Sequence, residues 1–234
     1  MPAPARGPHP PAALPPVGLV WAGSTGAVLA EAGPDPWSLL TGVERARAEG
    51  FRADADRADF LAAHVLVRLC AGRLLGLPAG ALTLVQSCGS CPRPHGRPRL
   101  VEAPGLGVSL AHTRGRVAAV AAPGPVGVDV EELAGPAPDP RLVARACTRE
   151  ERAAWTAAGG SREVFLRQWV RKEALVKAGA GSLDEAARID VPVHGRGPAR
   201  WRGRRLTDWT RAGAVGCAAT AGPVRLRLLD PDPP

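Results

Sequence analysis

The chain of 234 residues contains no tyrosine, and aromatic residues make up only 4% of it. Alanine, valine and leucine must therefore fill most of any core, with six tryptophans left for special positions. Hydrophobic residues still amount to 45%, enough for one good-sized packed domain or two small ones. The 28 glycines and 25 prolines predict many turns.

Long apolar runs are also missing, and no stretch approaches the length that a membrane-spanning helix needs. Residues 1–16 are rich in proline and lack the apolar core of a signal peptide, so we expect a disordered leader there. The five cysteines are odd in number, which fits a reducing compartment better than a disulfide framework. We therefore expect a cytoplasmic protein without a membrane partner.

One pair of cysteines is closely spaced. Cys88 and Cys91 form a C-x-x-C sequence, and His95 follows. A structural zinc site commonly takes four ligands, often as two such pairs, and the chain offers no second pair. We expect a cysteine-containing loop here in preference to a zinc site.

Lysine is nearly absent, because the 30 basic residues comprise 28 arginines and 2 lysines. The formal charge of +8 and the pI near 10.4 favour an acidic partner, such as a nucleic acid, an anionic lipid, a phosphorylated ligand or an acidic protein. The arginines are scattered along the chain, which argues against nucleic acid. Both lysines, Lys172 and Lys177, fall within residues 165–183, and a lysine ammonium is a compact charge suited to a phosphate oxygen.

The segment 165–183 has helical periodicity. Phe165, Trp169, Glu173 and Lys177 recur every four residues and would share one face of the helix, and glycines follow at its end. A plain amphipathic helix with a favourable glutamate-to-lysine pair is one interpretation. A functional face is the other.

Residues 126–131 (VGVDVE) read as a strand. The period of two places two valines on one face and Asp129 with Glu131 on the other. The pair is either the acidic face of a half-exposed strand or a site for a hard cation, because magnesium takes one or two carboxylates and completes its shell with water and phosphate oxygens. Gly127 permits close approach of another backbone.

The remaining pattern predicts short helices and strands on both sides of this strand, without a clear internal repeat. Thr41 with Glu44, and Thr148 with Glu151, have the spacing of capping boxes. The expected helices are 42–49, 56–75 and 141–158 with a break near 148–150. The expected strands are 17–21, 81–86, 107–112, 117–122, 189–193, 204–210 and 215–221, and a last apolar run follows at 224–229. Residues 126–131 are predicted to form a hairpin with 117–122, and 87–98 to form a loop.

Four segments now stand in order: GRP at 96–98, SLAHTRG at 109–115, VGVDVE at 126–131 and FLRQWVRKEALVKAGAGSL at 165–183. The series resembles the Sfp-type 4'-phosphopantetheinyl transferases, with their pattern G-[IV]-D-[IV]-E followed by F-x-x-x-W-x-x-K-E-x-x-x-K-x-x-G-x-G-L. The long motif is highly specific, and this chain departs from it only near its end, where the glycines stand at 179 and 181 and Ser182 precedes Leu183. The likeness covers about residues 17–221.

The resemblance implies an α+β fold: a pseudo-dimer of two similar α+β halves with the active site in the cleft between them. We accordingly expect a leader at 1–16, an N-terminal half at 17–123, a C-terminal half at 124–229 that carries the metal site, and a disordered tail at 230–234.

The activity implied is transfer of 4'-phosphopantetheine from coenzyme A, the co-substrate, to a serine of an apo carrier protein, with Mg²⁺ as cofactor and adenosine 3',5'-bisphosphate released. Acyl, polyketide and peptidyl carriers are generally acidic, which suits a basic enzyme. A monomer is expected, because two fused halves already form the cleft. The alternative is a basic nucleic-acid-binding or regulatory protein without catalysis, whose binding would weaken with salt.

By the resemblance, Asp129, Glu131 and Glu173 are the magnesium ligands, and Glu173 or a water that it orients takes the proton of the attacking serine. Lys177 meets the pyrophosphate, and His112 contacts a phosphate of coenzyme A. Glu173, Lys177 and His112 form the expected catalytic set.

Further contacts to coenzyme A are expected from basic side chains. Arg97 of the GRP segment stands where the family has a basic residue near the 3'-phosphate, and Lys172 is a second phosphate contact. Arg57 is a candidate from the N-terminal half, with Arg45 and Arg47 as alternatives.

Two positions depart from the family pattern. Ala111 stands where many relatives have a serine that helps to hold phosphate, so Ser109, Thr113 or Arg114 would have to replace it. Asp59 stands where some relatives have a basic residue, which leaves the contacts from that helix open.

Overall fold

The computed structural model describes residues 14–88, 95–191 and 199–230. The strands are β1 Gly18–Ser24, β2 Leu84–Ser87, β3 Arg97–Leu100, β4 Leu106–Thr113, β5 Arg116–Pro123, β6 Gly127–Glu132, β7 Ala199–Trp201, β8 Arg204–Arg211, β9 Ala214–Thr220 and β10 Val224–Leu228. The helices are α1 Thr25–Ala32, α2 Gly42–Glu49, α3 Asp54–Leu75, α4 Pro140–Ala146, α5 Arg149–Ala157 and α6 Arg162–Lys177. Short 3-10 helices follow at η1 Pro36–Leu39, η2 Ala79–Ala81 and η3 Leu183–Arg188.

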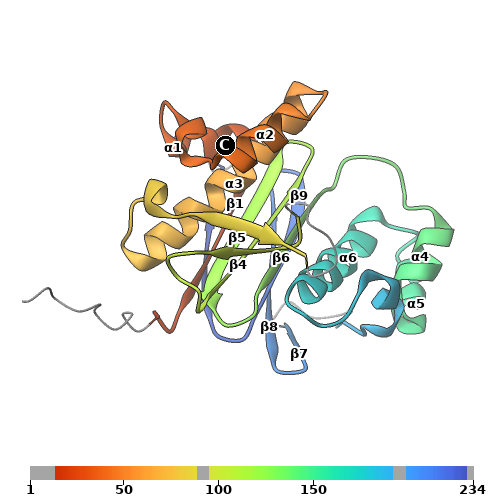
Figure 1. Cartoon of the computed structure of the whole chain (residues 1–234). Coiled ribbons are helices and arrows are strands. Elements are labelled where there is room, and N and C mark those ends of the chain that lie inside the picture. Colours follow the sequence, from red (N-terminus) through yellow and green to blue (C-terminus); the bar gives the residue numbers. More distant parts are fainter. Residues whose placement is uncertain (1–13, 89–94, 192–198, 231–234) are drawn as a thin grey trace, which may run out of the picture.

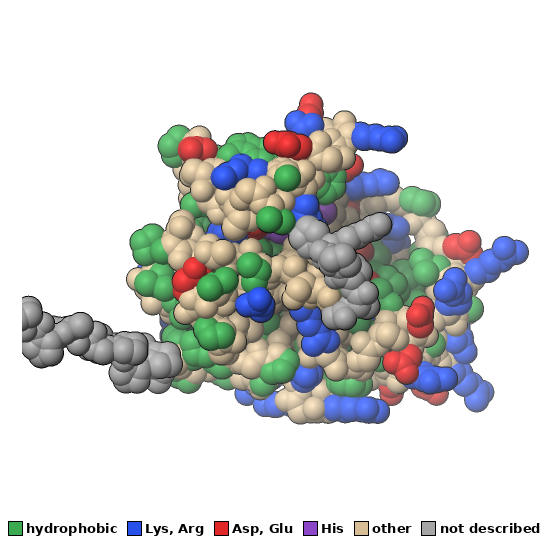
Figure 2. Space-filling model, in the orientation of Figure 1, with side chains coloured by type: hydrophobic (Ala, Val, Ile, Leu, Met, Phe, Trp, Pro, Cys, Tyr) green, Lys and Arg blue, Asp and Glu red, His purple; other side chains and the backbone are tan. Residues whose placement is uncertain are grey.

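Two four-stranded sheets organise these elements, with helices on their outer sides (Figure 1). Their strand orders are β10-β1-β5-β4 and β6-β9-β8-β7, and β2 and β3 form a separate hairpin. Basic side chains are spread over the face seen in Figure 2, among acidic and apolar ones. With these sheets and helices, the described residues form the mixed α+β fold that was predicted.

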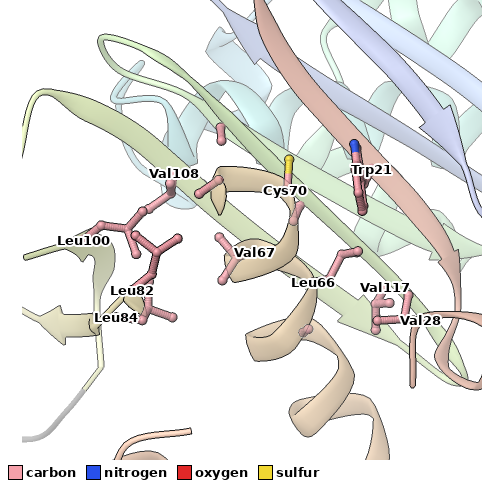
Figure 3. Packing of buried hydrophobic residues seen from close by; sticks show 14 of the residues in the cluster. Trp21, Val28, Leu66, Val67, Cys70, Leu82, Leu84, Leu100, Val108 and Val117 are labelled. Atoms are coloured by element: carbon pink, nitrogen blue, oxygen red, sulfur yellow. The ribbon is translucent and has the colours of Figure 1, made fainter. Parts of the chain in front are cut away.

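The first sheet is built around β5, whose small apolar residues are almost all buried. β1 and β4 pair in antiparallel orientation with β5, one on each side of it. β10, near the end of the chain, pairs in parallel with the other side of β1. The 22-residue helix α3 packs on one face of this sheet. Figure 3 shows Leu66, Val67 and Cys70 of α3 directed at the sheet, with Trp21 of β1 on the facing side.

The second sheet repeats this plan around β9, which is buried along its whole length. β6 and β8 pair in antiparallel orientation with β9, one on each side of it, and β7 pairs in antiparallel orientation with β8. The 16-residue helix α6 packs on β6 and β9. Their common core includes Phe165, Val170 and Leu175 of the helix with Val215 and Cys217 of the strand.

The two sheets face each other through a third apolar cluster. β1 and β5 contribute alternate residues such as Val20 and Val120, and β6 contributes Val128 and Val130. Because neighbouring residues of a strand point to opposite faces, the acidic residues of β6 must face α6. The alternation predicted for residues 126–131 is confirmed.

Helices α2 and α3 confirm the predicted 42–49 and 56–75, and the 141–158 helix is divided into α4 and α5 close to the predicted break. Both capping boxes form, with Thr41 N donating to Glu44 at 2.7 Å and Thr148 N donating to Glu151 at 2.8 Å. Local capping chemistry therefore fixed the starts of two helices correctly.

The predicted hairpin between 117–122 and 126–131 is wrong, since β6 pairs with β9. Both edges of β5 are already taken by β1 and β4, so the turn after β5 delivers the chain to the facing sheet. The predicted strand at 189–193 is not formed at Ile189–Val191, and its last two residues lie outside the described part of the chain. The predicted loop at 87–98 includes the start of β3, and α1 and η1 were not predicted.

In the described part of the chain, no helix combines the length and apolar character needed to cross a bilayer.

Candidate functional site

Asp129 and Glu131 extend from β6 toward α6. Asp129 is 7% exposed, and its backbone pairs with β9 opposite Cys217. Glu131 is half-buried near the C-terminal end of the strand and accepts hydrogen bonds from the side chains of Trp169 and Thr113, the latter at 3.4 Å. A strand interior therefore fixes the first carboxylate, while side-chain donors orient the second.

Helix α6 lies unusually close to β6 because Gly127 has no side chain. A Cβ placed on Gly127 would come within 2.0 Å of the carbonyl oxygen of Ala174 and 2.9 Å of Cβ of Lys177. The expected role of Gly127 in close backbone approach is borne out by these contacts. The helix is also anchored at its start, where Arg162 donates to the carbonyl oxygens of three residues that end or follow β6.

Lys177 reaches from the last turn of α6 to β6. Its Nζ donates to Oδ1 of Asp129 at 2.7 Å and to the carbonyl oxygen of Val128 at 3.2 Å. The other carboxylate oxygen of Asp129, Oδ2, is buried and has no hydrogen-bond partner. A buried carboxylate oxygen without a partner is costly, so this atom is a strong candidate for binding a cation or a ligand.

Burial raises the pKa values of all three carboxyl groups, and the charge of Asp129 raises those of the other two further. Burial raises the pKa of Asp129, and Lys177 opposes that rise. Burial and the charge of Asp129 raise the pKa of Glu131. Glu173, one turn before Lys177 on α6, has its pKa raised by burial, then by Asp129 and, more weakly, by Glu131. Such mutual repulsion is relieved when a cation binds between the groups.

A divalent cation fits this donor set. Carboxylate oxygens are the hard ligands that Mg²⁺ prefers, and one or two of them suffice when water and phosphate oxygens complete the shell. In the described part of the chain, no three His, Cys, Asp or Glu side chains stand close enough to enclose a metal by themselves. The unpartnered Oδ2 of Asp129 and the shared charge of Glu131 and Glu173 therefore fit a metal that is completed by substrate, not a closed protein cage.

A pocket of about 430 Å³ opens beside Lys177, within the range of small-molecule sites. Residues from β2, β3, β4, the segment just before β6 and the end of α6 line it: Gln86, Gly96, Arg97, Pro98, Gly107, Val108, Ser109, Leu110, Pro125, Val126, Val176, Lys177 and Gly181. Arg97 lies over Gly179, since a Cβ there would be 3.4 Å from its guanidinium. The two predicted phosphate contacts Arg97 and Lys177 thus share one pocket.

His112 and Thr113 end β4 on the approach to the carboxylates. His112 is exposed, and its pKa is lowered by partial desolvation and by the charge of Lys177, against the opposing charge of Asp59. Thr113 hydrogen-bonds Glu131. The structure therefore places His112 where the charge of Lys177 acts on it, and Thr113 within hydrogen-bond reach of Glu131.

Lys172 is not placed to contact a phosphate, and that assignment is corrected. Its side chain is completely buried, and Nζ lies 2.6 Å from Oε2 of Glu151. The same ammonium donates to the carbonyl oxygens of Ala146 at 2.8 Å and Ala186 at 2.7 Å. All three of its donors are thus used inside the protein, where they tie α6 to α4, α5 and η3.

Arg57 is brought together with its predicted alternative Arg45, but not with Arg97 and Lys177. It pairs with Asp54 at 3.2 Å and lines a separate pocket of about 350 Å³ with Trp37, Arg45 and Glu49. Arg57 is not among the residues that line the Lys177 pocket.

Asp59, one of the two departures from the family pattern, has a structural role, and so does Ser109, a candidate to replace the serine missing at Ala111. Asp59 is buried and accepts hydrogen bonds from the Thr25 hydroxyl and, at 2.9 Å, from the backbone of Gly115, so it fixes the β4–β5 turn. Ser109 accepts a hydrogen bond from the backbone of Val128 at 3.3 Å. It therefore links the facing strands β4 and β6.

Sequence reasoning missed several supporting residues. Trp169 donates to Glu131, as the four-residue spacing from Glu173 could have suggested. Gln86 lines the Lys177 pocket, accepts a hydrogen bond from Arg47 at 2.5 Å and donates to Gly96 at 3.3 Å. This last interaction supports the turn before Arg97, and no local signal in the sequence marks it.

A short internal repeat, T-x-x-E-R-A, was missed as well. It occurs at 41–46 and again at 148–153. Each copy caps a helix, each arginine donates to the carbonyl oxygen just before the threonine, at 2.6 Å from Arg45 and 2.7 Å from Arg152, and each glutamate is buried against a cation of the next long helix.

Cys88 and His95 lie together, with Sγ 3.2 Å from Nε2. Cys91 lies outside the described residues, so the C-x-x-C sequence as a whole has no structural description.

Comparison with known families supports the chemistry of the second half of the chain. Residues 125–214 match the model of the 4'-phosphopantetheinyl transferase superfamily. The matched range contains β6, α6 and all three carboxylates. No curated protein matches the chain. Over this range, the chain is similar to the 4'-phosphopantetheinyl transferases.

Proposed function

We propose that the protein is an Sfp-type 4'-phosphopantetheinyl transferase that moves the phosphopantetheine arm of coenzyme A to a serine of an apo carrier protein. One observation carries the proposal. The charge of Asp129 raises the pKa values of Glu131 and Glu173, and Lys177, which contacts Asp129, lines a pocket together with Arg97. The family match over residues 125–214 supports the same chemistry.

In the proposed reaction, the serine hydroxyl oxygen attacks the phosphorus that carries the pantetheine arm. A new phosphorus–oxygen bond forms while the bond to adenosine 3',5'-bisphosphate breaks, and the serine proton passes to Glu173 or to a water that Glu173 orients. The raised pKa of Glu173 suits a group that must accept a proton near neutral pH. Proton removal and bond exchange then take place on the same side of α6.

Asp129, Glu131 and Glu173 would hold Mg²⁺. When bound, the metal would supply neutralisation of the charge that develops on the leaving bisphosphate. Lys177 stabilises the pyrophosphate as a mobile point charge, and its present contact with Asp129 keeps the buried carboxylate partly neutralised until substrate arrives.

The remaining contacts to coenzyme A are assigned by position. Arg97, at the rim of the pocket, is proposed to meet the 3'-phosphate, and His112 a phosphate of the same molecule. Thr113 is proposed to act beside His112 in place of the serine that Ala111 replaces. Arg57 and Lys172 are left out of this set.

We further propose that the chain is a pseudo-dimer of two α+β halves, 17–123 and 124–229, with the active site in the cleft between them. Three correspondences support this: the central strands β5 and β9, the long helices α3 and α6, and the repeated T-x-x-E-R-A. β10 belongs to the second half by sequence but pairs with β1 in the sheet of the first half.

The proposed partners are acidic acyl, polyketide or peptidyl carriers and coenzyme A, acting with a monomeric enzyme in the cytoplasm. The charge of +8 would speed encounter with an acidic carrier. We propose no nucleic-acid or membrane partner, because buried carboxylates beside the basic groups do not suit a binder of phosphate backbones.

Intact mass spectrometry tests the proposal. A panel of apo acyl and peptidyl carriers is incubated with the protein, coenzyme A and Mg²⁺, and at least one carrier should gain a single phosphopantetheine. The same mixtures with EDTA in place of Mg²⁺ should show no gain. A panel without any modified carrier would reject the transferase, and salt-sensitive binding to arbitrary DNA by the same sample would favour the alternative of a basic nucleic-acid-binding protein.

A further inference from the structure

A second pocket, of about 660 Å³, lies away from the carboxylates. Its floor is apolar and includes Leu19 and Trp21 of β1 and Leu74 of α3. Three arginines surround this floor: Arg73, Arg225 and Arg227. Trp21 stands on the face of β1 that is directed at α3 (Figure 3), and β10 extends that face beyond the cover of the helix.

The rim of this pocket is positively charged. All three arginines are exposed. Arg227 lies over the Trp21 ring at 4.5 Å and pairs with Glu31 at 2.9 Å. Among the residues that the structure describes, Arg73 and Arg225 have no ion-pair partner. Two guanidinium groups thus face a roomy pocket with their charge unbalanced.

The internal repeat relates this pocket to the Lys177 pocket. Arg68 and Lys172 hold the same position in their respective helices, since each binds the buried glutamate of its own T-x-x-E-R-A copy. Five residues further along each helix stand Arg73 and Lys177, both in the last turn. Arg73 is therefore the counterpart of Lys177.

The strands correspond in the same way. Two residues after Arg68 and Lys172 come Cys70 and Ala174. Cys70 contacts the backbone of Leu19, as Ala174 contacts Gly127. Leu19 thus corresponds to Gly127, and two residues later Trp21 corresponds to Asp129.

The pocket beside Arg73 contains cationic side chains, but it lacks counterparts of the carboxylates near Lys177. Trp21 replaces Asp129, and Leu69, four residues before Arg73, replaces Glu173. Without these oxygens it cannot hold a hard cation or accept a proton. β10 adds two further arginines, whose planar guanidinium groups match phosphate oxygens in pairs.

We propose that the pocket lined by Arg73, Arg225 and Arg227 is a second anion site that binds a small molecule bearing phosphate groups, without metal and without catalysis. The choice of phosphate as the anion rests on the function proposed for Lys177. The existence of an anion site rests on the arginines themselves.

Isothermal titration with inorganic pyrophosphate, in EDTA and 150 mM salt, tests this site on the full chain. The probe should bind the unaltered protein at two classes of site. Arg73→Gln with Arg225→Gln should weaken one class at least tenfold and leave the transfer rate within twofold, while Lys177→Gln should weaken the other class. Arg141→Gln with Arg145→Gln on α4 removes the same charge at exposed positions and should leave both classes unchanged.

An unchanged titration after the Arg73 and Arg225 substitutions would overturn the second site. Equal weakening by the α4 control would also overturn it, because the binding would then reflect net charge alone. If every protein fails to modify carriers but the Arg73-dependent class persists, the transferase proposal fails and the anion site stands. The substituted arginines are exposed, and an unchanged melting temperature would confirm intact folding.

Discussion

The two halves of the molecule contain similar buried ion pairs, but the side chains that lie beside these pairs differ. In the first half, Glu44 binds Arg68 with oxygen and nitrogen atoms 2.6 Å apart; in the second, Glu151 binds Lys172 at the same distance. Each cation also donates to a carbonyl beyond its own long helix, Arg68 to Leu82 and Lys172 to Ala186. The scaffold is therefore shared, and the chemistry depends on what lies beside it.

Beside Lys172 stand Glu173 and, across on β6, Asp129; the counterparts in the first half are Leu69 and Trp21. A small number of substitutions on one strand and one helix thus separates a carboxylate site from an apolar core. The comparison predicts that damage to the ion pairs destabilises either half, whereas damage to the carboxylates affects activity alone.

The largest effect is expected from Asp129→Asn. It removes the charge of the buried carboxylate that Lys177 contacts, and the transfer rate should fall by about 10³-fold, the scale seen when one preorganised charge contact is removed. Glu132→Gln, at the last residue of β6, is the control and should stay within twofold of the unaltered rate. Intact mass spectrometry measures the transfer rates, and calorimetry checks that the variants are folded. A near-normal rate in Asp129→Asn would contradict the assignment of Asp129 as a metal ligand.

Next in size are Lys172→Met and Arg68→Met. Each leaves a buried glutamate without its cation, which should lower the free energy of unfolding by about 3–5 kcal/mol, measured by urea titration. Where both variants are still folded, the KM for coenzyme A should be unchanged in Lys172→Met, because its ammonium is used internally. A large rise in that KM would restore Lys172 as a phosphate contact.

Acid should destabilise the first half through Glu44. Burial alone would raise its pKa, but hydrogen bonds from His64 and Arg68, the charge of Arg68 and the backbone of Thr41 lower it from 4.5 to about 2. A pKa lowered by folding stabilises the protein above the unfolded value and is lost as pH falls from 4.5 to 2, a contribution of about 3 kcal/mol. His64 acts in the same direction at higher pH, because burial lowers its pKa.

Urea unfolding between pH 7 and pH 2 measures this loss. Glu44→Gln should be less stable at neutral pH and should show a flatter profile below pH 4.5. An identical slope in the variant and the unaltered protein would exclude Glu44 as the source.

The smallest effect is expected at Gly127. Gly127→Ala places a Cβ against the backbone of α6, and the helix must shift away from β6, at a cost of about 1–3 kcal/mol. Gly26→Ala in α1 meets open space and should be neutral or stabilising by about 0.5–1 kcal/mol. Thermal unfolding compares the two, and equal stability would contradict the close approach of strand and helix.

Much of this arrangement could be predicted from local sequence. The capping boxes, the period of two in residues 126–131 and the helical spacing of residues 165–177 are local signals, and each was realised in the structure. The assignment of Lys172 to phosphate was wrong, because spacing along a helix does not reveal whether a side chain points inward. The partner of β6 was also mispredicted, since strand pairing depends on which edges other strands have already occupied.

Manganese binding to the protein with coenzyme A tests the central claim most directly, with the ion's electron paramagnetic resonance signal as the readout. Mn²⁺ should bind at one site per chain, more tightly when coenzyme A is present, and Asp129→Asn or Glu173→Gln should weaken that binding at least tenfold while Glu132→Gln leaves it unchanged. Equal Mn²⁺ affinity in all four proteins would contradict a metal site formed by Asp129, Glu131 and Glu173.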